Sequence, residues 1–318
     1  MNNATPSMFE DVVVFPDDGA GDRYRRLVGL DETKEHVARE ATLLLAPQKL
    51  QEWSQKHHGK PIALLERFQQ RTSMFLFSGD VGTGKTELAE TFGHAVARAG
   101  KMTVTAYRIS LFARGRGAVG EMTSLVTRAF AEVTEAAKRY VGGAKVPRGA
   151  VILVIDEADA LAQSRGLAQM HHEDRAGVNA LIRGLDGLTA HRLPALVVLC
   201  TNRLDSIDPA VRRRAAKVFH FERPGAAECA EVLSCLGDAG FTTKQIEELA
   251  AELGDTRRNG FGCTYSDLVQ RFLPSLVLDA FPNRPVTPAR ALELAQEFSP
   301  TPPFREDGAN HTHPSPGG

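Results

Sequence analysis

The chain has 318 residues, about twice the length of an ordinary domain, so we expect one large domain with a smaller companion. Its 38 Lys and Arg residues balance 39 Asp and Glu residues to a formal net charge of −1, which excludes an overall basic field for holding a polyanion. Hydrophobic residues make up 42% of the chain, enough for a sizeable core, and no apolar run approaches the roughly 18 residues of a membrane-spanning helix. We expect no secretory signal and no disulfide framework, and therefore a cytoplasmic protein.

The N-terminal quarter of the chain carries two different patterns. Residues 1–25 mix polar residues, prolines and glycines around one apolar patch at residues 12–15, which is typical of a flexible arm. From residue 26 to about residue 70, leucines recur at roughly helical spacing. We therefore expect a flexible arm over 1–25, followed by helices that precede the main sheet.

Short apolar strands then alternate with helical segments. This order predicts an α/β domain over residues 26–224, with a parallel sheet between helices. After Pro224 the strand signal ends, and the pattern predicts a small all-helical lid domain over 225–298 and a disordered, proline-rich tail over 299–318. The expected strands are 74–78, 102–107, 151–155, 196–200 and 218–221, and the expected helices lie from about 85 and near 121–139, 175–185, 226–237, 243–253, 265–281 and 287–297.

A glycine-rich segment with the spacing of a nucleotide phosphate loop follows the first of these strands and precedes a helix. Its glycines let backbone N–H groups turn toward phosphates, and the helix N-terminus adds partial positive charge. We expect Lys85 to reach the β- and γ-phosphates of ATP and the Thr86 hydroxyl to bind Mg²⁺. The loop residues assigned to nucleotide binding are Asp80, Val81, Gly82, Thr83, Gly84, Lys85 and Thr86.

Two carboxylates follow the apolar strand at 151–155, where ligands bind parallel sheets. Asp156 is expected to hold Mg²⁺ together with Thr86, and Glu157 to activate the attacking water as general base. With Asp159 these residues spell the box of the DEAD helicases, but the further helicase segments are not recognisable in this chain. An acidic turn that caps the next helix is the alternative.

Polar residues also follow the strand at 196–200. Asn202 is placed to contact the γ-phosphate and the attacking water, and three arginines, Arg212 to Arg214, come shortly before the next strand. An arginine that reaches a neighbouring subunit's γ-phosphate stabilises transition-state charge. A solvated basic cluster and a nucleic-acid contact are the alternatives for these arginines, the second disfavoured because no aromatic residues are interleaved with them.

These pieces in this order resemble the AAA+ ATPases, over roughly residues 26–298. The resemblance implies a homohexameric ring with ATP at the subunit interfaces, Val28 and Gly29 near the adenine, and lid movement coupled to hydrolysis. It assigns Asn202 as first sensor and Arg213 as arginine finger, with Arg214 as the other candidate for that role. For the second sensor, Arg257, Arg258 and Arg271 remain open.

A narrower similarity is carried by the stretches 110–112, 125–127, Phe130, 174–175, 178–181 and 214–215. They resemble those of the AAA+ remodellers of HORMA-domain proteins, which have bacterial relatives in CBASS antiphage operons. In such ATPases a pore loop grips the substrate, and its place here holds Ala118, Val119 and Gly120, with alanine where an aromatic residue is usual. We therefore expect an ATP hydrolase that remodels a HORMA-domain protein partner. A nucleic-acid motor or loader, a general protein unfoldase and a nonenzymatic scaffold are the alternatives.

Overall fold

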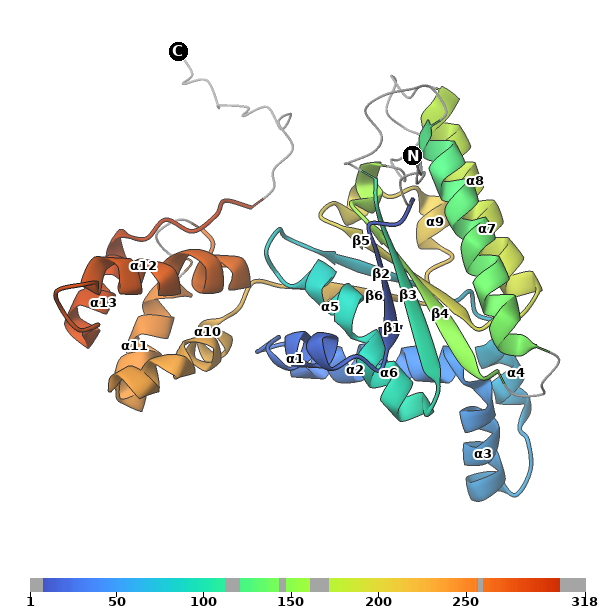
Figure 1. The fold of residues 1–318 in the computed structure, drawn as a ribbon, viewed down its shortest axis with the longest axis horizontal. Coiled ribbons are helices and arrows are strands. Elements are labelled where there is room, and N and C mark those ends of the chain that lie inside the picture. Colours follow the sequence, from blue (N-terminus) through green and yellow to red (C-terminus); the bar gives the residue numbers. More distant parts are fainter. Residues whose placement is uncertain are drawn as a thin grey trace, which may run out of the picture. The chain divides into compact units, whose positions relative to one another are not determined.

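The computed structural model describes residues 8–111, 121–142, 147–160, 172–254, 256 and 260–303, without the side chains of 172–175 (Figure 1). The chain divides into two compact units. Unit 1 contains residues up to 79 together with 83–222, and unit 2 contains 80–82 together with the residues from 223 onward. The phosphate loop therefore contributes its first three residues to unit 2 and the rest to unit 1.

Unit 1 is built on a six-stranded sheet in the order β1-β3-β4-β5-β2-β6. All neighbouring strands are parallel except β1, which pairs antiparallel with β3 at one edge. The expected α/β class with a parallel sheet and a helical companion is confirmed, and the antiparallel edge strand was not expected. The strands are β1 (Asp11–Phe15), β2 (Met74–Gly79), β3 (Thr103–Ser110), β4 (Gly149–Asp156), β5 (Ala195–Thr201) and β6 (Lys217–Phe221).

Helices cover both faces of this sheet (Figure 1). Side chains alternate between the faces of a strand, so Met74 and Leu76 of β2 join the core beneath α7 and α8. Phe77, on the opposite face, packs against Phe92 beside α5 and α6. The helices of unit 1 are α1 (Asp18–Arg25), α2 (Asp31–Leu45), α3 (Pro47–His58), α4 (Ala63–Gln69), α5 (Lys85–Thr91), α6 (Gly93–Gly100), α7 (Glu121–Val141), α8 (His172–Ala190) and α9 (Pro209–Arg212), with short 3-10 turns η1 (Ala158–Ala160) and η2 (Leu204–Ser206).

The N-terminal segment differs from the flexible arm expected over residues 1–25. From Asp11 it forms β1 and then α1, and the described pairs run from Asp11 opposite Arg108 to Phe15 opposite Val104. Phe15 is 1% exposed, and a Cβ on Gly93 would lie 2.4 Å from its ring. The apolar patch thus belongs to an edge strand, in which Phe15 is buried while Val12 and Val14 are exposed. The partner strand lies about ninety residues further along the chain, which local composition does not reveal.

Unit 2 is helical and has its own apolar core. The helix expected over 265–281 is divided into a π-helical turn and a regular helix, while a capping box at Thr242 begins α11. No helix among the residues that the structure describes is long and apolar enough to cross a membrane. The elements are α10 (Ala226–Leu233), η3 (Ser234–Ala239), α11 (Thr243–Leu253), η4 (Asp267–Phe272), α12 (Leu273–Ala280) and α13 (Pro288–Glu297).

The four cysteines are free thiols. Burial raises the pKa of the Cys200 thiol in β5 well above its usual range, and it raises the pKa of Cys229 and of Cys263 to about 12. These three thiols therefore stay protonated and unreactive at neutral pH, and they serve as small apolar core residues.

Candidate functional site

The glycine-rich loop connects β2 to α5. All of β2 from Met74 to Ser78 is buried, and α5 begins at Lys85, whose residue surface is only 6% exposed. Gly82 and Gly84 have φ values of 77° and 90°, in the left-handed region that favours glycine. The backbone therefore turns twice just before Lys85, as a loop must if its N–H groups are to face a phosphate.

The segment at Val28 and Gly29 lies beside this loop within unit 1. A Cβ on Gly84 would come within 3.0 Å of the Leu30 side chain and 3.6 Å of the Leu27 side chain. Gly29 adopts φ 73°, which turns the chain between these two leucines. The two predicted adenine-contacting residues are thus on the same side of unit 1 as Gly84.

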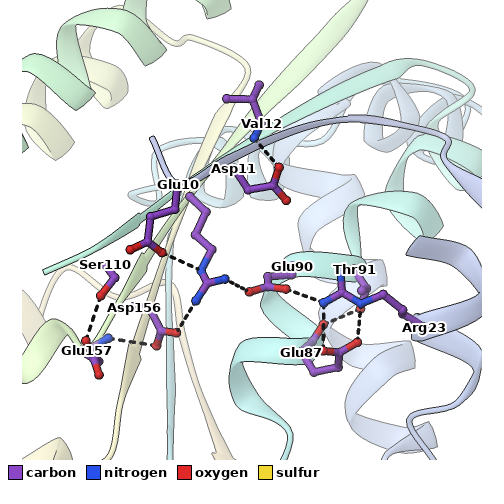
Figure 2. A network of polar contacts seen from close by, with 11 residues as sticks. Glu10, Asp11, Val12, Arg23, Glu87, Glu90, Thr91, Ser110, Asp156 and Glu157 are labelled. Carbon is purple, nitrogen blue, oxygen red and sulfur yellow. Dashed lines mark hydrogen bonds and ion pairs between the residues drawn. The ribbon is translucent and has the colours of Figure 1, made fainter. Parts of the chain in front are cut away.

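Two carboxylates extend from the end of β4, next to the end of β3 (Figure 2). Asp156 Oδ1 accepts a 2.9 Å hydrogen bond from the Glu157 backbone N–H, and Glu157 Oε2 accepts one of 2.9 Å from the Ser110 hydroxyl. Glu157 has φ 54°, a left-handed conformation that costs a non-glycine residue about 1 kcal/mol. The turn and the Ser110 contact hold the Glu157 carboxylate beyond the sheet edge, where a general base can meet water.

A half-buried arginine lies next to Asp156. Arg108 of β3 lies 3.6 Å from Asp156 Oδ2, 2.6 Å from Glu90 Oε1 and 3.6 Å from Glu10 Oε2. Glu90 also accepts a hydrogen bond of 2.5 Å from Arg23 of α1 (Figure 2). A chain of alternating charges therefore runs from the N-terminal segment through α5 to the carboxylate of Asp156.

The end of β5 supplies the third polar group. In the register, Thr201 lies opposite Ser78 of β2, and Leu199 lies opposite Ile155 of β4, so Asn202 follows the strand between the phosphate loop and the carboxylates. The Thr201 hydroxyl is buried and donates to Asp159 Oδ1 over 3.1 Å. Parallel register thus brings Asn202 to the sheet edge that carries Lys85 and Glu157.

The structure places the two neighbouring arginines in different surroundings. Arg214 donates two hydrogen bonds to Asp186 of α8, of 2.9 and 3.1 Å, and one to the Ala210 carbonyl. The hydrogen bonds to Asp186 raise the pKa of Arg214. Arg213 is exposed and forms no ion pair with any residue that the structure describes. Of the two side chains, that of Arg213 is the one that the described residues leave exposed.

Sequence reasoning missed the residues of unit 2 that contact the start of the phosphate loop. Ser266 N–H donates to the Gly82 carbonyl over 3.1 Å, and a Cβ on Gly82 would meet Thr264 and Ser266 at 2.8 Å. Arg223 forms an ion pair with Asp80. These residues carry no distinctive spacing, so only the folded chain reveals that they lie against the loop.

Of the three candidates for the second sensor arginine, the structure describes Arg271. Arg271 donates to Asp267 and to the Ser299 carbonyl, and its guanidinium lies over the Phe298 ring, so its contacts hold unit 2 together. Arg257 and Arg258 lie outside the described residues, as do the expected pore-loop residues Ala118, Val119 and Gly120 and the tail from residue 304.

Comparison with known proteins decides the family. The ATPase family associated with various cellular activities (AAA) matches residues 75–223, from β2 to just beyond β6. A curated relative from Escherichia coli (strain MS 115-1), CD-NTase-associated protein 6, is 47% identical over 306 residues, which cover 95% of this chain and 98% of the relative. The chain belongs to the AAA ATPases. It is an ATP hydrolase that binds nucleotide, and the resemblance found in the sequence is confirmed.

Two solved structures match this AAA ATPase along nearly its whole length. One is a chain in the structure of the E. coli MS115-1 HORMA:CdnC:Trip13 complex, with 46% identity and a TM-score of 0.87, covering 94% of this chain and 99% of that chain. The other is Rhizobiales Trip13, with 41% identity and a TM-score of 0.74, covering 93% and 100%. The similarity therefore extends through both units and well beyond the segment 75–223.

Proposed function

We propose that this AAA ATPase uses ATP hydrolysis to remodel a HORMA-domain signalling protein in bacterial antiphage CBASS defence, in the cytoplasm. The observation that carries the proposal is the match over nearly the full length to a chain of a HORMA:CdnC:Trip13 complex. The 47% identity to CD-NTase-associated protein 6 supports the same partner class. The net charge of −1 speaks against a nucleic-acid motor.

In the proposed mechanism, the residues at the sheet edge divide the work of ATP hydrolysis. Lys85 binds the β- and γ-phosphates, Glu157 takes a proton from the attacking water, and Asn202 orients that water. Thr86 and Asp156 offer the hydroxyl and carboxylate oxygens that suit Mg²⁺, and the 15% exposed Asp156 side chain stays accessible to an ion. Mg²⁺, when bound there, supplies positive charge that neutralises the phosphates.

The proposed assembly is a homohexamer in which each site is completed by a neighbour. Because Arg214 is held by Asp186 and Arg213 is exposed, we assign Arg213 as the finger that stabilises γ-phosphate charge in the next subunit. Val28 and Gly29 are assigned to the adenine. Ala118, Val119 and Gly120 are assigned to the pore loop, where the missing aromatic side chain favours brief remodelling of a loosely held segment over long processive pulling.

The test measures ATP turnover of the purified protein with and without a HORMA-domain partner, together with complex formation by size-exclusion chromatography. Stimulated turnover, and a stable ATP-dependent complex with the Glu157→Gln variant, are expected. Lys85→Ala is the matched control, because it weakens nucleotide binding and so forms no such complex. Turnover that ignores the HORMA partner but rises with a generic unfolded protein or with DNA would replace this proposal with an unfoldase or a nucleic-acid motor.

A further inference from the structure

Unit 2 holds an ion pair at the start of the phosphate loop. Asp80 Oδ2 accepts hydrogen bonds from Arg223 Nε and Nη2, at 2.9 and 2.5 Å. The remaining terminal nitrogen of Arg223 donates to the Gly262 carbonyl over 2.7 Å, and the guanidinium lies 5.0 Å from the Phe261 ring centroid. Both charged side chains are largely covered, with 13% of Arg223 and 18% of Asp80 exposed.

A carboxylate at this position disfavours the binding of negatively charged phosphates. Asp80 directly follows β2 and lies five residues before Lys85, inside the loop assigned above to nucleotide binding. Repulsion between a carboxylate and phosphates is poorly screened where both are shielded from solvent, and it grows with the number of phosphate charges. Without a compensating cation, Asp80 would weaken binding of ATP more than binding of ADP or AMP.

We propose that Arg223 neutralises Asp80 and thereby sets the affinity of the phosphate loop for nucleotide polyphosphates. Arg223 is then a positioning and specificity-determining residue that acts through Asp80. The proposal rests on the ATPase activity of the family and is independent of the HORMA partner. The competing explanation is that Arg223 only ties the loop to Gly262, in which case the charge of Asp80 has no influence on nucleotide binding.

The decisive experiment compares Arg223→Met, Asp80→Asn and the double variant by isothermal titration of the full chain with ATP, ADP and AMP. Arg223→Met is expected to weaken ATP binding by about tenfold, ADP binding by less, and AMP binding hardly at all, because each phosphate adds repulsion. Asp80→Asn alone is expected to bind ATP at least as tightly as the unchanged protein. The double variant is expected to recover ATP affinity to within about threefold, since the unpaired carboxylate is gone.

A matched control comes from the same unit. Arg290 of α13 forms a comparable pair with Asp279 of α12 at 3.1 Å, with no described contact to the phosphate loop, so Arg290→Met is expected to leave all three affinities unchanged. Equal losses for ATP and AMP in Arg223→Met, or no recovery in the double variant, would overturn the proposal. If Arg223→Met does not fold, as judged by thermal unfolding, Asp80→Asn decides alone: weaker ATP binding in that variant overturns the proposal.

Discussion

The hydroxyl of Ser110, at the end of β3, donates a 2.9 Å hydrogen bond to the carboxylate of Glu157, at the end of the neighbouring β4. Ser110 pairs with Asp156 in the strand register, so the contact crosses diagonally from one strand to the residue beyond the other. Glu157 is also held by its left-handed backbone and by the N–H bond to Asp156. The proposed general base therefore has a fixed direction before any nucleotide arrives.

Replacing Ser110 with alanine tests this orientation. Ser110→Ala is expected to lower kcat for ATP hydrolysis by about tenfold while KM stays within about twofold, because the hydroxyl positions Glu157 and makes no contact required for binding. Steady-state kinetics at saturating ATP measure the effect. Ser110→Thr keeps the hydroxyl and is expected to restore most of kcat. A rise in KM without a fall in kcat would mean that Ser110 acts on nucleotide binding.

Substitutions of the two arginines before β6 are expected to have different effects, one on ATP turnover and the other on stability. Arg213→Ala should reduce turnover by about 10³-fold without weakening ATP binding, because only transition-state charge is left uncompensated. Arg214→Ala should lower the free energy of unfolding by about 1 kcal/mol through loss of its bonds to Asp186. Mixing Arg213→Ala with Glu157→Gln should regain activity, since the first subunit supplies a base and the second a finger to the same site. No recovery on mixing would place Arg213 in its own subunit's site.

Arg108 is expected to stabilise unit 1 through its ion pairs. Arg108→Met removes the cation beside the partly buried Asp156 and leaves Glu90 with its bond from Arg23, which should cost about 3 kcal/mol in the free energy of unfolding. Glu10→Gln removes only the outermost carboxylate of the same network, at 3.6 Å, and should cost less than about 1 kcal/mol. Urea unfolding of both variants measures the difference. Equal costs would show that the Arg108 side chain acts through packing alone.

The hydrogen bonds and the ion pair of Asp267 are expected to make the stability of unit 2 depend on pH. Burial disfavours its charge, but bonds from Thr301, from the Thr264 N–H and from Arg271 outweigh burial and hold the pKa of Asp267 below its usual value. Because the folded pKa lies below the unfolded one, this stabilisation is present above about pH 4 and is lost as the pH falls through the folded value. Asp267→Asn should destabilise unit 2 by about 2 kcal/mol at pH 7 and flatten the decline below about pH 4. Thermal unfolding between pH 3 and 7 distinguishes the variant, with Thr301→Ala as a milder control.

Much of the large domain could be read from local pattern. Alternating strands and helices predicted the sheet, and the loop residues around Lys85 predicted the nucleotide site, because glycine turns and buried apolar runs leave short-range signals. The strand at β1 escaped detection since its residues become strand-like only when paired with β3. Ser110, Arg108 and Arg223 were missed for the same reason, because each acts through a partner at least 47 positions away along the chain.

The choice between two neighbouring arginines depends on tertiary contacts and not on sequence spacing. Arg213 and Arg214 have the same chemistry and adjacent positions, so their spacing does not show which of them is the finger. In the structure, Arg214 forms an ion pair with Asp186 of α8, and Arg213 is exposed. The sequence by itself determined the family, the ATP-hydrolysing chemistry and the strands that carry it, since these depend on residue types at short fixed intervals. Only the tertiary structure decided which charges meet, because ion pairs and hydrogen bonds join residues that folding brings together from distant parts of the chain.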